Sequence, residues 1–178
     1  GSTNGISAAI TSFFNAWQTL ASDPTSASNR QQVLTQAQGL ATAISQTGGQ
    51  LDTLTGNINS QIQSTVGNIN SIASSIAKLN DSIAVETARG GGSTPNELLD
   101  QRDQLLTQLS SLTQVRTNTE SDGAVDVFIA NGQALVVRNQ ATALGTTPNQ
   151  YDATKLDVTY GSGGGKQVLT DSLNTGQL

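Results

Sequence analysis

Residues 51–83 read LDTLTGNINSQIQSTVGNINSIASSIAKLNDSI. Apolar residues recur in this stretch in steps of three or four, which is the stripe of an amphipathic helix: Leu51, Leu54, Ile58, Ile62, Val66, Ile69, Ile72, Ile76, Leu79 and Ile83. The other positions are mainly Ser, Thr, Asn, Gln and Ala, and from Gln31 to Ala77 only Asp52 is ionisable. A free-standing coiled coil would carry Glu and Lys beside its seam. The stretch therefore predicts a helix buried among like neighbours in an assembly.

The pattern extends this helix to about Ser26 and Ala88, which corresponds to about 90 Å at 1.5 Å per residue. Gly48 and Gly49 interrupt it, and each glycine costs up to ~1 kcal/mol relative to alanine. A break at the pair and a continuous helix are both compatible with the sequence. The apolar stripe resumes in phase after the pair, which favours continuity.

Two shorter helices flank the long one. The first is predicted from about Asn4 to Ala21. The other begins at Thr94-Pro95-Asn96-Glu97, where a capping Thr precedes a Pro at the first helical position and a Glu at the third, and it ends near Leu112. We therefore expect three antiparallel helices, which form a helical rod over residues 1–113.

After Leu112 the period of the sequence changes from 3.6 to 2. Asp122-Gly123 and Asn131-Gly132 predict tight turns. The runs around and beyond them read as strands: Val115–Glu120, Ala124–Ala130, Gln133–Asn139 and Leu156–Tyr160. Residues 140–152 read as a surface loop. A small sheet is marginal alone, so we expect this β-hairpin-rich part, residues 114–178, to pack on the helices.

The predicted fold class is α+β: an elongated antiparallel helical bundle with one very long helix, followed by a small antiparallel β-rich part. The chain is predicted to end at Leu178 within a longer protein, because Thr175–Leu178 completes no element.

Composition argues against an enzyme. The chain has no His and no Cys, which excludes a Ser-His-Asp triad, a Cys-His pair and a His-ligated zinc site within it. Glu97, Asp100 and Asp103 share one side of a helix and could bind a hard cation, but a solvated acidic face near a helix N-terminus is the favoured interpretation. Residues 161–166 lack the spacing of a phosphate loop. We predict no catalytic, metal or cofactor site.

The formal charge of −5, without a basic run, argues against nucleic acid as a partner. No stretch approaches the about 20 apolar residues that a membrane helix needs.

The block Leu98-Leu99-Asp100-Gln101-Arg102-Asp103, followed by Asn131-Gly-Gln-Ala-Leu-Val136, resembles the FlgK family of flagellar hook-associated proteins. Phe13-Phe14-Asn15-Ala16 is similar to an early segment of that family, and Ile76-Ala77-Lys78-Leu79-Asn80 to the end of its long helix. Thr175–Leu178 resembles the start of a further segment. The resemblance implies a piece of such a protein that lacks both chain termini.

The resemblance implies a structural subunit of the bacterial flagellum that forms the hook–filament junction. Such a protein is exported by the type III apparatus without a cleaved signal peptide and is extracellular. It contacts the hook protein, the second hook-associated protein and copies of itself in a ring. An export chaperone acts through the C-terminal end that this chain lacks, and the isolated chain is expected to be a monomer.

The alternative is another type III-exported filament or needle-tip structural protein. Such a protein would lack the block from Asp100 to Asp103 followed by two glycine-turn hairpins.

Arg102 falls at an apolar position of the third helix. A charge there is costly unless it is paired. If the two later helices form a hairpin that turns near Gly91, Arg102 lies opposite about residue 80, within reach of Asp81. We predict an Asp81–Arg102 bridge that fixes their register, with neighbouring Leu98, Leu99, Asp100 and Asp103 in a structural role. The alternative is that Arg102 extends to solvent along its aliphatic stem.

Overall fold

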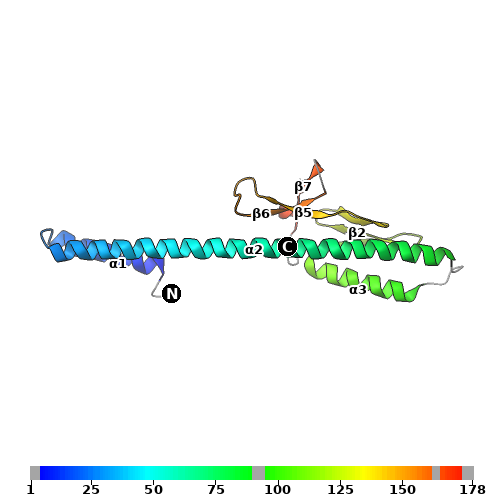
Figure 1. Cartoon of the computed structure of the whole chain (residues 1–178), viewed down its shortest axis with the longest axis horizontal. Helices are drawn as coiled ribbons and strands as arrows, with labels where there is room; N and C mark the ends of the chain where they lie inside the picture. The colour runs from blue at the N-terminus through cyan, green and yellow to red at the C-terminus, as the bar shows by residue number, and fades with distance from the viewer. Residues whose placement is uncertain (1–4, 90–94, 162–164, 174–178) are drawn as a thin grey trace. The chain divides into compact units, whose positions relative to one another are not determined.

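The computed structural model describes residues 5–89, 95–161 and 165–173 (Figure 1). Three helices come first: α1 (Ile6–Ser22), α2 (Ala27–Arg89) and α3 (Asn96–Leu112). Strands in two small antiparallel sheets follow, which confirms the predicted α+β class. The chain forms two compact units, residues 1–56 and 57–178, and α2 contributes to both. The predicted division into residues 1–113 and 114–178 follows the change in secondary structure and stays a prediction.

The long helix α2 is continuous. It spans 63 residues without an interruption, so the prediction of a continuous helix through Gly48 and Gly49 is confirmed. Its first turn is capped by Ser26, whose Oγ accepts a hydrogen bond from the backbone N–H of Asn29 at 3.2 Å. This contact satisfies one of the N–H groups that the first turn of a helix leaves without a helical partner.

The start of α3 differs by one position from the prediction. Pro95 precedes the first helical residue, and its carbonyl accepts from the N–H groups of Leu98 and Leu99, both at 3.1 Å. The expected capping residue Thr94, like the expected turn at Gly90–Gly92, lies outside the described residues.

The first sheet has the strand order β1-β2-β3-β4, and the second has the order β5-β6-β7. The strands are β1 (Val115–Thr119), β2 (Val125–Ile129), β3 (Gln133–Val137), β4 (Gln140–Ala141), β5 (Leu144–Pro148), β6 (Leu156–Tyr160) and β7 (Gln167–Val168), with a short 3₁₀ turn at Thr170–Ser172. Both predicted tight turns are present, and Gly123 and Gly132 have φ angles of 85° and 94°.

The prediction of a surface loop over residues 140–152 is wrong for β4 and β5. The sequence of β5, LGTTP, has no alternation of apolar residues that would reveal a strand. Its strand structure comes from backbone pairing with β6, in the register Leu144↔Tyr160 to Pro148↔Leu156. Long-range pairing has overridden weak local propensity here.

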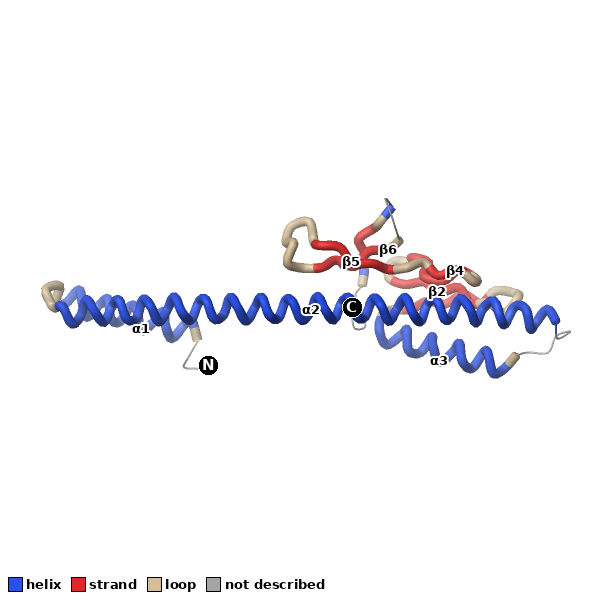
Figure 2. The backbone as a smooth tube through the Cα atoms, viewed as in Figure 1, coloured by secondary structure: helices blue, strands red, loops and turns tan. Residues whose placement is uncertain are grey.

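In residues 57–178 the helices and both sheets share one hydrophobic core. α3 and the two sheets lie along the C-terminal part of α2 (Figures 1 and 2). The buried core residues are Val66, Ile69, Ala73, Ile76, Ala77, Leu109, Val125, Val127, Ile129, Leu135, Val136, Leu144, Val158 and Leu169. The expected packing of the β-rich part on the helices is confirmed.

The unit of residues 1–56 consists of α1 and the first part of α2. Ala16 and Val33 are its buried apolar residues among those described. Small residues of α1, such as Ala9 and Ser12, line the same pocket as Gly39 of α2. Large apolar side chains remain exposed on this unit: Ile10, Phe14, Trp17, Leu34, Ile44, Leu51 and Leu54. Its core is therefore thin.

Candidate functional site

Arg102 is buried, with 6% of its surface exposed. Its Nη1 donates a hydrogen bond of 2.6 Å to the carbonyl of Gly123 in the turn before β2. Its Nε lies 3.9 Å from Oδ1 of Asp103 and has no hydrogen-bond partner. Burial lowers the pKa of the Arg102 guanidinium, and the charge of Asp103 opposes that shift. Arginine stays protonated in proteins, so Arg102 is a buried cation bound to a backbone carbonyl.

The predicted Asp81–Arg102 bridge is not formed. In the part of the chain that the structure describes, the acidic partner of Arg102 is Asp103, and Asp81 accepts from Nδ2 of Asn139 at 3.3 Å. The prediction treated α2 and α3 as an isolated hairpin. The guanidinium donates its hydrogen bond to the turn at Gly123, a third element that the prediction did not consider. Arg102 does not extend to solvent either, because it is buried.

The neighbours of Arg102 divide by exposure. Leu98 and Leu99 are half-buried, whereas Asp100 and Asp103 are exposed. Their structural role, and any role of Asp81 and Arg102 in setting the register of the helices, stay predictions.

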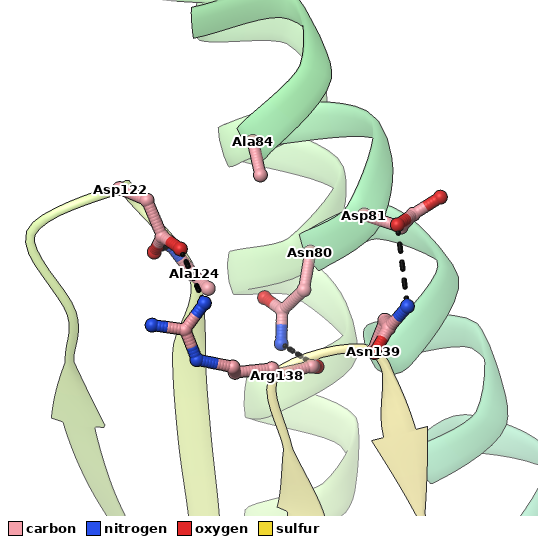
Figure 3. A pocket seen from close by; sticks show the side chains of 7 residues that line it. All are labelled: Asn80, Asp81, Ala84, Asp122, Ala124, Arg138 and Asn139. Carbon is pink, nitrogen blue, oxygen red and sulfur yellow. Dashed lines mark hydrogen bonds and ion pairs between the residues drawn. The ribbon is translucent and has the colours of Figure 1, made fainter. Parts of the chain in front are cut away.

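A small pocket of about 140 Å³ lies where α2 meets the turns of the first sheet (Figure 3). Asp122 and Arg138 form an ion pair of 3.0 Å beside it, and the side chains of Asp81 and Asn139 are joined on its other side. The remaining lining residues are Asn80, Ala84 and Ala124. Both carboxylates that line the pocket are therefore held in polar contacts.

Glu97, Asp100 and Asp103, the acidic residues of α3, are all exposed. Within residues 5–89, 95–161 and 165–173, no three His, Cys, Asp or Glu side chains converge as ligands for a metal ion. Over the same residues, no helix combines the length and hydropathy required to cross a membrane.

Sequence reasoning missed three asparagines of α2 that bind strand backbone. Oδ1 of Asn70 accepts from the N–H of Leu144 at 2.8 Å, and its Nδ2 donates to the carbonyl of the same residue at 2.9 Å. Oδ1 of Asn80 accepts from the N–H of Val125 at 3.0 Å, and its Nδ2 donates to the carbonyls of Val125 and Arg138 at 2.8 and 2.7 Å. Figure 3 shows Asn80 directed at Arg138.

Asn59 makes the same kind of contact. Its Oδ1 accepts from the N–H of Leu156 at 3.1 Å, and its Nδ2 donates to the carbonyl of Thr154 at 2.7 Å. A signal for two of the three was present in the sequence, because the pentapeptide GNINS occurs at residues 56–60 and again at 67–71. The second asparagine of each copy is the one that binds the sheet.

Comparisons with known proteins extend the motif resemblance to the whole chain. Residues 1–178 match the model of the flagellar hook-associated protein FlgK helical domain. The flagellar hook-associated protein 1 of Salmonella typhimurium is 35% identical over 177 residues, which cover 98% of this chain and 32% of that protein. The protein of the same name from Escherichia coli (strain K12) is 34% identical over 179 residues, which cover 99% of this chain and 33% of that protein.

The solved structure of the flagellar hook junction protein FlgK from Burkholderia pseudomallei has the same fold. It superposes with a TM-score of 0.88 at 38% identity, covering 99% of this chain and 32% of that one. The chain spans about a third of the length of these relatives. With its full length matched in sequence and fold, this chain belongs to the family of the flagellar hook-associated protein FlgK helical domain.

Proposed function

We propose that this chain is a structural part of the bacterial flagellum, at the junction between hook and filament. One observation carries the proposal: the whole chain matches, in sequence and in fold, proteins named flagellar hook-associated protein 1 and flagellar hook junction protein. The Asp100–Asp103 block and both glycine-turn hairpins are present, which favours this family over a needle-tip protein.

We also propose that the chain has no catalytic activity of its own. The family is one of flagellar structural proteins. The sequence lacks the His and Cys residues that most nucleophilic and metal-dependent mechanisms use. The polar pocket beside Asn80 holds its carboxylates in contacts with Arg138 and Asn139.

The proposed partners are the hook protein, the second hook-associated protein and further copies of the same protein in a ring. The exposed apolar side chains of residues 1–56, among them Phe14 and Trp17, support an assembled state, because burial of apolar surface against a partner is favourable. The same proposal includes an extracellular location in the flagellum and export without a cleaved signal peptide. It also includes an export chaperone that binds a part of the protein outside this chain.

A chimera tests the proposal directly. The matching segment of the Salmonella typhimurium relative is replaced by residues 1–178 of this chain in cells that lack the relative's own gene. We expect the cells to swim and electron microscopy to show filaments attached to hooks. A matched chimera with Leu109→Asp, which places a charge in the core at a fully buried position, should lose attachment. A chimera that is exported in normal amount but leaves hooks without filaments would contradict the proposal.

A further inference from the structure

We propose that Asn59, Asn70 and Asn80 act as strand-edge clamps: they fix the position of both sheets along α2 and close the sheet edges where no strand covers them. The proposal concerns residues 57–178 only. It is independent of the proposed place of the protein in the flagellum. The three contacts support it one by one.

Asn70 covers the outer edge of the second sheet. β5 is the first strand in the order β5-β6-β7, so within the described residues its strand partner is β6 alone. Leu144 lies opposite Tyr160 of β6 in that pairing. On its other side, both backbone groups of Leu144 bind the amide of Asn70. The asparagine therefore occupies the place of a missing neighbouring strand.

Asn80 covers the place where β3 leaves β2. The pairing of these strands runs from Ile129↔Gln133 to Val127↔Val136 and does not reach Val125. Val125 has Thr119 of β1 on one side and the amide of Asn80 on the other. Nδ2 of Asn80 also binds the carbonyl of Arg138, just after β3 ends. The contact is buried, since Asn80 has 1% of its surface exposed.

Asn59 covers the start of β6. The short strand β7 pairs with Thr159 and Tyr160 of β6. Among the strands that the structure describes, the other end of β6 is paired with β5 alone. There the N–H of Leu156 and the carbonyl of Thr154 bind the amide of Asn59.

An asparagine amide suits this task because it has one carbonyl and one NH₂ group and so reproduces the acceptor and donor of a peptide unit. An uncovered strand edge presents unpaired N–H and C=O groups, and these can pair with a second chain. If the edge is buried, the same unpaired groups destabilise the fold. Each clamp removes one such opening.

The clamps also specify register, which the apolar stripe of α2 does not. Aliphatic residues recur along the stripe every three or four positions, so a shift of one turn, about 5.4 Å, would replace one aliphatic contact by another. The same shift would break all three pairs of amide contacts at once. A single buried asparagine is known to set register in coiled coils. Here three asparagines set the register between a helix and two sheets.

The test uses the complete 178-residue chain and amide hydrogen exchange resolved by residue. Asn70→Ala and Asn70→Leu both remove the clamp, and the leucine variant keeps most of the side-chain volume. Asn68→Ala is the matched control, because Asn68 lies in the same GNINS segment and is exposed. We expect exchange of the Leu144 amide to become at least about 10-fold faster in both Asn70 variants and to be unchanged in the control.

Thr159 serves as the internal reference, because it pairs with Gly145 inside the β5–β6 ladder. Its exchange should change much less than that of Leu144, and sedimentation should show more self-association of the Asn70 variants. Equal acceleration at Thr159 would indicate a general loss of stability and overturn the proposal. So would normal Leu144 protection in Asn70→Leu. If the Asn70 variants do not fold, Asn59→Ala provides the same test. Exchange of the Leu156 amide should then become faster, and unchanged exchange would overturn the proposal.

Discussion

Gly123 shows how a local signal and a long-range contact combine at one residue. The Asp122-Gly123 pair predicted a turn from sequence, and Gly123 has a φ of 85°. A Cβ atom at this position would lie 3.2 Å from Cγ2 of Ile83 on α2. The carbonyl of Gly123 also accepts a hydrogen bond from the guanidinium of Arg102. The turn was predictable from two residues, whereas the contacts with α2 and α3 depend on residues far away in the sequence.

Gly123→Ala should therefore destabilise the chain more than Gly132→Ala. Both positions have positive φ, which costs a non-glycine residue about 1–2 kcal/mol. A Cβ at Gly132 would meet open space, whereas the one at Gly123 crowds a fully buried isoleucine. Urea unfolding of the two variants measures the difference. Equal losses of unfolding free energy would show that the contact with Ile83 relaxes without cost.

A double-mutant cycle on Asp81 and Arg102 should give a coupling free energy within about 0.5 kcal/mol of zero, as for residues with no shared partners. Asp81 contacts Asn139, and Arg102 contacts Gly123 and Asp103. The variants Asp81→Ala and Arg102→Met, alone and together, are compared by urea unfolding. A coupling free energy above about 1 kcal/mol would contradict this and support the Asp81–Arg102 bridge that the sequence predicted.

Asp152 should titrate below the ordinary range of an aspartate. The hydroxyl of Thr154 donates to its carboxylate, Lys155 and the N–H of Thr154 add to the effect, and together they lower the pKa of Asp152. Because the folded pKa lies below the unfolded value of about 3.9, the stabilising effect is present above that value. It is lost as the pH falls through the folded pKa.

The titration is read from the carboxyl resonance of Asp152 by NMR. Thr154→Val should raise the pKa of Asp152, whereas Thr117→Val, at an exposed position of β1, should not. An unchanged value in Thr154→Val would contradict the assignment of the hydroxyl as the main cause.

At the scale of elements, α2 was predictable and β5 was not. The apolar stripe gave a helix from about Ser26 to Ala88, close to the observed Ala27–Arg89. β5 lacks a stripe, and its backbone partners are β6 and the side chain of Asn70, 74 residues away in sequence. The period of the apolar residues identifies an element that has one buried face. It does not identify a strand whose position is set by hydrogen bonds from distant residues.

Gly48→Ala and Gly49→Ala should each stabilise α2 by up to about 1 kcal/mol, because alanine has the higher helix propensity. A Cβ at either position would have no atom within 4 Å beyond its own helix and neighbours. Thermal unfolding followed by far-UV circular dichroism measures the gain. Gly132→Ala provides a control of opposite sign, since that glycine has a φ of 94°. A loss of helix stability in the Gly48 or Gly49 variant would show that the glycine has a role that the structure does not explain.

At the scale of the whole molecule, one helix serves two units that differ in their cores. Residues 57–178 bury apolar side chains from α2, α3 and both sheets, whereas Ala16 and Val33 are the buried apolar residues described in residues 1–56. The sequence predicted the helices, the shared packing and, through the Leu98–Asp103 block, the family. It did not predict the asparagine contacts or the partner of Arg102, because each depends on the strands and turns of the sheets as well as on the helices.

Amide hydrogen exchange along α2 tests most directly the central claim, that this continuous helix carries a well-packed structural unit along only one part of its length. Protection reports the free energy of local opening, which follows the burial around each amide. We predict that amides of residues 65–83, the range that holds the buried positions in the second half of α2, exchange at least about 10-fold more slowly than those of residues 31–56, in one uninterrupted helix. Uniform protection along α2, or stronger protection in its first half, would contradict the account.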